Sequence, residues 1–323
     1  MNGEQCHIIV NPAAGGGRTG QLLPVLRPTL HSTFGNDASV YVTKMPGDAR
    51  GSAREAVRDG SRLIVVVGGD GTIYEAVNGI CSLPPALTRN VTLAVISTGT
   101  GCGLARSLGI PATIQDQIAV ACDSSLRAID LGKLHLMKAE RTLFFVNECQ
   151  IGIGAEVVRR TRRGKKALGG SLTYALVTVP LLFSYPNPEL VLVIDNAPPL
   201  SLHATGISIG NGAITGGGMH LTPHAVLDDG LIDVLVMKGQ SPFHRVASFA
   251  RVRSGNHVRS SRFTYQQVRR IEISSPSKLP VSADGEIVGN LPATFEVLPL
   301  ALQIHCPTEQ RREVSHEHIS SAA

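Results

Sequence analysis

The fold of this chain is decided by the stretch Leu63-Ile64-Val65-Val66-Val67-Gly68-Gly69-Asp70-Gly71-Thr72. Its unbroken β-branched run predicts a strand covered on both faces, as in a parallel sheet. Apolar residues at helical spacing follow over 73–80, so the glycines form a turn between strand and helix. Ligands bind at the carboxyl ends of such strands, and glycines let the backbone approach phosphate oxygens. We therefore expect a phosphate-binding turn in which Asp70 orients a hydroxyl or a metal-bound water; a tight turn capped by Asp70 is the alternative.

Two further glycine-rich turns follow predicted strands. Residues 11–18 (NPAAGGGR) come after a strand at 8–10, and residues 97–104 (STGTGCGL) come after a strand at 91–96. A strand at 39–43 and a helix at 49–57 complete an alternating pattern, which predicts a parallel α/β sheet whose turns converge on one edge. The first turn is not a P-loop, because Gln21 and Leu22 stand where Lys and Ser or Thr are required. None of the turns matches the dinucleotide fingerprint.

The pattern changes from about Leu126. Short alternating strands are expected at 143–147, 190–194, 205–209, 231–237, 268–273, 280–283 and 293–298, with helices at 155–163 and 171–182. The predicted fold class is therefore α/β, with an N-terminal parallel-sheet nucleotide-binding domain and a C-terminal antiparallel, β-sandwich-like domain. The expected boundaries are 1–129 for the nucleotide-binding domain and 130–307 for a β-rich acceptor domain, whose last strands are allowed to return to the first. A polar tail follows at 308–323.

Composition excludes several classes of protein. The 323 residues are 43% hydrophobic and 17% charged, which is too apolar for a disordered chain. Eight Phe, five Tyr and no Trp do not supply the stacking platforms of single-stranded nucleic-acid binders, so we expect no nucleic-acid partner. Six cysteines without a CxxC pair indicate reduced thiols and a cytoplasmic protein. We expect no secretion signal, and the apolar stretch 172–183 is too short to cross a bilayer.

The glycine turns also resemble a known family. Asn11-Pro12, the Gly-Gly-Asp-Gly-Thr turn and Gly99-Thr100-Gly101 are similar to the catalytic domain of the diacylglycerol kinase and sphingosine kinase family. The likeness continues in family order across almost the whole chain, through Phe145-Val146-Asn147, Gly152, Ala155-Glu156-Val157, Gly210-Asn211, Gly216-Gly217-Gly218, Pro223, Asp228-Asp229-Gly230-Leu231 and Asp284-Gly285-Glu286.

The resemblance implies ATP-dependent transfer of phosphate to a hydroxyl of a diacylglycerol-like or sphingoid lipid, with ATP and Mg²⁺ as cofactors. Glu286 resembles the family's general base, and Asp70 would act beside it. Asp229, with the backbone of Val226 and Leu231, matches a structural Mg²⁺ site of bacterial members. The residues carried over to the nucleotide site are Asn11, Thr43, Gly68, Gly69, Asp70, Gly71, Thr72, Gly99 and Thr100.

The substrate and partners are open at this stage. Cys102-Gly103 stands where many diacylglycerol kinases have Asn-Asp, so diacylglycerol and a sphingoid base are both candidates. A soluble kinase related to NAD kinases is an alternative, since those share the Gly-Gly-Asp-Gly turn and a pair such as Asn147-Glu148; a non-catalytic binding module is another. The basic run 159–166 beside an apolar segment predicts peripheral contact with an anionic membrane, with a solvated helix face as the alternative. Exposed edges of an antiparallel sheet leave room for a homodimer.

Overall fold

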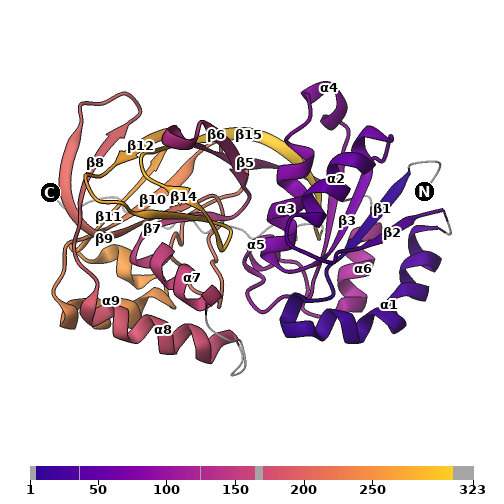
Figure 1. The fold of residues 1–323 in the computed structure, drawn as a ribbon, viewed down its shortest axis with the longest axis horizontal. Coiled ribbons are helices and arrows are strands. Elements are labelled where there is room, and N and C mark those ends of the chain that lie inside the picture. Colours follow the sequence, from indigo (N-terminus) through magenta and orange to yellow (C-terminus); the bar gives the residue numbers. More distant parts are fainter. Residues whose placement is uncertain (1–4, 36, 124, 164–169, 308–323) are drawn as a thin grey trace, which may run out of the picture.

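A computed structural model of the chain describes residues 5–35, 37–123, 125–163 and 170–307. Its first half contains the predicted parallel sheet, ordered β2 (Ser39–Val42), β1 (Cys6–Val10), β3 (Leu63–Gly68) and β4 (Thr92–Ser97) (Figure 1). All three pairings are parallel. Every side chain of β3 is buried, as its unbroken apolar run predicts.

Helices cover both faces of this sheet. On one face α1 (Arg18–Phe34) and α6 (Ile114–Cys122) pack against alternate residues of β1, β3 and β4. On the other face lie α2 (Asp48–Arg58) and α3 (Asp70–Ile80), which confirm the predicted helices. The short helices α4 (Pro85–Thr88) and α5 (Gly103–Ser107) flank β4 in the chain.

The second half is a sandwich of two antiparallel layers. One layer contains β5 (Leu126–Leu136), β6 (Arg141–Phe145), β8 (Glu189–Ile194), β12 (Arg270–Ser274) and β15 (Ala293–His305). The other contains β7 (Glu148–Gly152), β10 (Ile232–Lys238), β11 (Phe263–Val268), β13 (Pro280–Ala283) and β14 (Glu286–Asn290). Strand β9 (Leu200–Gly210) joins both layers, because its first residues pair with β8 and its later ones with β7 and β10. Phe145 and Phe295 of one layer pack with Ile151 and Ile209 of the other, which confirms the sandwich-like prediction.

Two long strands connect the halves. The ladder between β5 and β15 runs from Leu136 opposite Ala293 to Leu126 opposite His305. At its far end β15 also pairs in parallel with β4, through Gln303 and Ile304. The last strand therefore extends the first sheet, and a boundary between residues 129 and 130 falls inside β5.

Three helices cover the outer face of the β7–β9–β10 layer. They are α7 (Ile153–Arg163), α8 (Gly170–Ser184) and α9 (Pro242–Val252), and they lie together along one side of the second half (Figure 1). The first two confirm the predicted helices at 155–163 and 171–182. No helix among the described residues is long and apolar enough to span a bilayer.

Several elements differ from the sequence prediction. The strand predicted at 143–147 ends at Phe145, because Val146 and Asn147 form the turn into β7. The strand predicted at 268–273 is the junction of β11 and β12. Strands β5 and β14 and helix α9 were not predicted. Polar residues interrupt the apolar alternation of β5, and the strand with which β14 pairs, β13, has only four residues. The predicted polar tail, 308–323, lies outside the described residues.

Candidate active site between the two halves

The three glycine turns meet at one edge of the parallel sheet. A Cβ on Gly99 would lie 2.7 Å from the Cα of Gly69, so these turns pack backbone against backbone. The first turn reaches the same place, because a Cβ on Gly15 would lie 2.5 Å from the carbonyl oxygen of Thr98 and its φ is +61°. The Asn11 Nδ2 donates to Thr72 Oγ1 over 2.9 Å. The predicted convergence is thus confirmed, with the amino end of α3 beside it.

Asp70 is the first residue of α3 and is held between two turns. Its Oδ2 accepts a hydrogen bond of 3.2 Å from the backbone N–H of Gly103, and its Oδ1 accepts one of 3.4 Å from Leu104. Burial raises the pKa of this carboxyl, while the two N–H groups and the charge of Arg106 act in the opposite direction. Asp70 is therefore a fixed carboxylate rather than a freely exposed cap.

Glu286 comes from the second half and reaches the glycine turn of the first. A Cβ on Gly71 would lie 2.7 Å from Glu286 Oε1, so this carboxylate lies directly against the turn. The same oxygen accepts a hydrogen bond from Arg162 Nη2 of α7, and Arg162 Nε also donates to the Gly285 carbonyl over 3.0 Å. Asp70 and Glu286, predicted from distant parts of the chain, thus flank one turn.

Two further carboxyl groups were not among the predicted site residues. Asp284 is buried, and its carboxylate accepts hydrogen bonds of 2.8, 3.0 and 2.9 Å from the backbone N–H groups of Val146, Asn147 and Glu148. Burial nevertheless raises the pKa of Asp284 to about 6. Asp284 therefore shapes the turn that presents residue 148.

Glu148 is the second of these carboxyl groups. Burial, followed by the negative charges of Asp284 and Asp70, raises its pKa to about 8, although a hydrogen bond of 2.8 Å from Gln150 Nε2 and the backbone N–H of Gly216 act in the opposite direction. Together these side chains line a polar pocket between the halves, formed by Asp70, Ile73, Leu104, Val146, Asn147, Glu148, Gly216, Asp284 and Gly285. The sequence features that belong to this pocket are the pair Asn147-Glu148 and the Asp284-Gly285 turn. Local sequence cannot show that they lie opposite Asp70.

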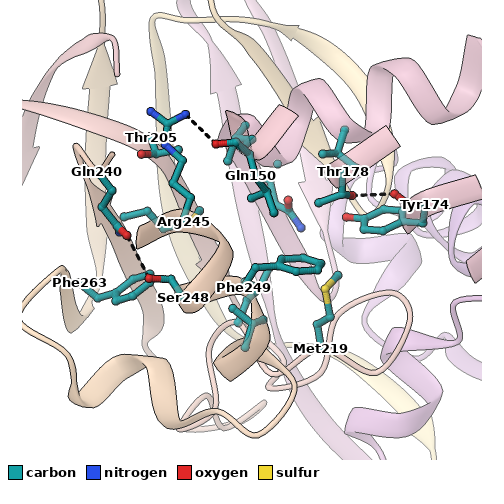
Figure 2. Close-up of a pocket in the computed structure, with 17 residues that line it drawn as sticks. Gln150, Tyr174, Thr178, Thr205, Met219, Gln240, Arg245, Ser248, Phe249 and Phe263 are labelled. Carbon is teal, nitrogen blue, oxygen red and sulfur yellow. Dashed lines mark hydrogen bonds between the residues drawn. The ribbon is translucent and has the colours of Figure 1, made fainter. Parts of the chain in front are cut away.

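An apolar pocket lies on the other side of Gln150. It is enclosed by α7, α8, α9 and the outer face of the β7–β9–β10 layer. Figure 2 shows Tyr174 and Thr178 of α8 on one side and Arg245, Ser248 and Phe263 on the other. Because Gln150 lines this pocket and its amide donates to Glu148, one residue separates the apolar pocket from the polar one.

Comparison with known proteins agrees with this geometry. Residues 5–134 match the diacylglycerol kinase catalytic domain, and residues 147–306 match the YegS C-terminal NAD kinase beta sandwich-like domain. A diacylglycerol kinase of Bacillus subtilis is 30% identical over 289 residues, covering 87% of this chain and 89% of the relative. A YegS-like lipid kinase of Pseudomonas aeruginosa is 31% identical over 278 residues, with 84% and 86% covered. The chain belongs to this family of lipid kinases.

Solved structures agree with the fold of the lipid kinase. A crystal structure from Bacillus anthracis superposes with a TM-score of 0.76 at 25% identity and covers 95% of this chain and 98% of that one. A second, of a diacylglycerol kinase from the same organism, gives 0.70 at 21% identity with the same coverage. The two-part architecture is therefore shared along nearly the full length.

The pocket that contains Asp70 is not lined by Asp229, Val226, Thr43 or Thr100. Asp229 accepts hydrogen bonds from Leu231 N–H over 3.0 Å and from Gln267 Nε2 over 3.1 Å, both within the second half, and Val226 is exposed. Thr43 is buried after β2, where its N–H donates to the Val10 carbonyl, and Thr100 is exposed in the third turn. In the described part of the chain no three His, Cys, Asp or Glu side chains are grouped as a metal site.

Proposed function

We propose that this lipid kinase transfers the γ-phosphate of ATP to a hydroxyl of a diacylglycerol-like or sphingoid lipid. The observation that carries the proposal is the pair of adjoining pockets, one lined by carboxyl groups beside the glycine turns and the other apolar. A lipid has the same division, with its hydroxyl at one end and its chain at the other. The Glu148–Gln150 hydrogen bond marks the boundary at which the two parts of the acceptor would meet.

The glycine turns suit the nucleotide. Gly68 to Thr72, with Gly99 and Thr100, bring glycine backbone and the amino end of α3 together, and both favour the binding of phosphate oxygens. Asn11 and Thr43 lie after the neighbouring strands β1 and β2. Arg18 and Arg106 line a separate recess against Thr98 and Gly99 and bring positive charge to the third turn. These features support binding of a triphosphate at this edge.

Glu286 is the side chain that we assign as general base. The Arg162 guanidinium forms an ion pair with its carboxylate, and a carboxylate is the form that accepts a hydroxyl proton. Its place against Gly71 sets it where acceptor and nucleotide would meet. Asp70 lies on the other side of the turn and orients the donor. Positioning and charge neutralisation account for most of the acceleration of phosphoryl transfer, so this arrangement supplies the parts required of the protein.

Mg²⁺ would act at two places. On the phosphates it would supply charge neutralisation, and the carboxyl oxygens of Asp70, which lines the pocket beside the glycine turns, are ligands of the kind that a hard cation prefers together with phosphate oxygens. The second place is Asp229 with the carbonyls of Val226 and Leu231. Asp229 fits as a ligand because each of its oxygens accepts one hydrogen bond and retains a lone pair.

An acceptor panel tests the proposal. Purified protein is incubated with γ-³²P-labelled ATP, Mg²⁺ and, separately, diacylglycerol, monoacylglycerol, sphingosine, ceramide and NAD⁺. We expect label in a diacylglycerol-like or sphingoid lipid. Label only in NADP⁺ would refute a lipid acceptor, and label in no acceptor, with ATP still bound, would indicate a binding module.

A further inference from the structure

Helices α8 and α9 present an apolar surface to solvent. Five of the fourteen large hydrophobic side chains that are exposed among the described residues lie on these two helices: Leu176, Val179, Phe183, Phe243 and Val246. Phe243 is the most exposed of all fourteen, at 80%. Solitary exposed hydrophobics are ordinary on protein surfaces, whereas a cluster on adjacent helices marks an interaction site.

The exposed residues form one stripe on each helix. On α8 they recur at positions 176, 179 and 183, and on α9 at 243 and 246 with the exposed Ala250 beyond them. These spacings place each set on a single helical face. The opposite faces, which include Thr178 and Arg245, line the apolar pocket. Both stripes therefore face away from that pocket.

The two helices are fixed side by side, so their stripes form one surface. Arg245 of α9 donates from Nη1 to the carbonyl of Leu182 over 3.3 Å and to that of Tyr185, which follows the last residue of α8. Phe249 of α9 packs against the cluster that contains Leu181 and Leu182. Figure 1 shows α8 and α9 running next to each other along the edge of the second half. We call the exposed residues 176, 179, 183, 243 and 246 the α8–α9 face.

In the chain segments that carry the α8–α9 face, the only charged side chains are positive. From residue 234 to residue 271 the chain has no Asp or Glu but has one Lys and seven Arg, and residues 170–188 carry no charge. Arg251, Arg253 and Arg259 are exposed after the stripe of α9, and none forms an ion pair with another described residue. Apolar side chains with unpaired cations at their border are typical of helices that lie in a membrane interface.

The arginines of α7 contrast with these. Arg159 and Arg160 are both hydrogen-bonded to Glu156, and Arg162 is paired with Glu286. The rest of the basic run, 164–166, lies outside the described residues. Among Arg159, Arg160, Arg162 and the three arginines on and after α9, only the latter three therefore lack an ion pair with another described residue.

We propose that the α8–α9 face docks the protein on an anionic lipid bilayer, with Phe243, Phe183 and Val179 inserted among the lipids and Arg251, Arg253 and Arg259 on the headgroups. The apolar pocket would then lie directly above the bilayer, so that an acceptor lipid passes to it without crossing bulk water. This second statement rests on the proposed function, whereas the docking itself does not.

Vesicle flotation of the full chain tests the docking. The probes are phosphatidylcholine vesicles with and without phosphatidylglycerol. We expect Phe243→Ser to weaken binding at least about tenfold on vesicles with phosphatidylglycerol. The double variant Arg251→Gln/Arg253→Gln should weaken it by about fivefold per arginine on those vesicles, and added salt should remove this difference.

Matched controls lie on the first half. Val25 is 73% exposed on α1, and Arg54 and Arg58 are exposed on α2. Val25→Ser and Arg54→Gln/Arg58→Gln should bind vesicles as the wild type does. Equal losses in these controls would show that net charge or general hydrophobicity, and not this face, governs binding, and would overturn the proposal.

A second copy of the chain is the alternative occupant. If sedimentation shows a dimer that Phe243→Ser dissociates while vesicle binding is unchanged, the face is a dimer interface and the proposal is wrong. Phosphorylation of a detergent-dispersed acceptor separates this proposal from the proposed function. Phe243→Ser should retain that activity, since Phe243 lies outside the pocket lining. Failure of the wild type to bind vesicles would refute the docking alone. Absence of any lipid phosphorylation by the wild type would refute the proposed function alone.

Discussion

Gly99→Ala tests the backbone contact that holds the glycine turns together. The new Cβ would lie 2.7 Å from the Cα of Gly69, whereas carbon atoms in contact are normally about 3.5–4.0 Å apart. The second and third turns must therefore separate by about 1 Å. The φ of Gly99 is not in the left-handed region, so backbone strain does not contribute.

The expected effect follows from that displacement. Overpacking of this size typically lowers the free energy of unfolding by about 1–3 kcal/mol. A misplacement of about 1 Å in a reacting group can lower the rate about 100-fold. We expect Gly99→Ala to lose about two orders of magnitude in kcat/KM for ATP, measured as label transferred to lipid, with urea denaturation reporting the change in stability.

Gly51→Ala is the matched control. Gly51 is inside α2, and a Cβ there meets no atom within 4 Å. This change should leave the rate unchanged and stabilise the helix by about 0.5–1 kcal/mol. A rate for Gly99→Ala within about twofold of the wild type would refute the argument that contact between the turns positions the nucleotide.

Three further predictions concern single carboxyl groups. Glu286→Gln keeps the shape but removes the proton acceptor, so kcat for lipid phosphorylation should fall about 100-fold or more while the Kd for ATP stays constant; an unchanged kcat would exclude Glu286 as the base. Glu148 has a folded-state pKa of about 8 against an ordinary 4.5, so its ionisation opposes folding as pH rises through that interval. Wild-type stability should therefore decrease between these pH values by up to about 1.4 kcal/mol per pH unit, and Glu148→Gln should flatten the slope in chemical denaturation; parallel slopes for both proteins would contradict this. Asp229→Asn removes one charge from the proposed structural cation site, so the rise in melting temperature on adding Mg²⁺ should shrink, and an undiminished rise would place the cation elsewhere.

The first sheet was the part of the fold most predictable from sequence. Strand β3 is an unbroken apolar run, and the turn after it begins with Gly69, whose Cα lies 2.7 Å from the position that a Cβ on Gly99 would take. Such local signals specify where a strand ends and a turn begins. Strand β5 has no comparable signal, since its partner β15 is over 150 residues away and the pairing between them is set by the tertiary structure.

The candidate site was predictable only in part. Asp70 was predicted from the glycine turn after β3, and Glu286 was predicted from the resemblance to a known family. Asp284 reads as a hairpin turn in the sequence, and only the fold reveals that it holds the backbone of residues 146–148. The pairing of Arg162 with Glu286 joins residues 124 positions apart, so charge pattern along the chain could not indicate it.

Filling the apolar pocket tests most directly whether the first half binds ATP while the second half binds the acceptor lipid. Thr178 lines that pocket on α8, and its hydroxyl donates only to the Tyr174 carbonyl of the same helix, so Thr178→Phe adds a ring without stranding a polar partner. The measurement is the rate of label transfer from γ-³²P-labelled ATP to the lipid that the wild type accepts, alongside the Kd for ATP. We predict a loss of lipid phosphorylation of about tenfold or more with an unchanged Kd for ATP and an undiminished melting temperature. Full lipid phosphorylation by this variant would show that the acceptor does not occupy the pocket and would contradict the account.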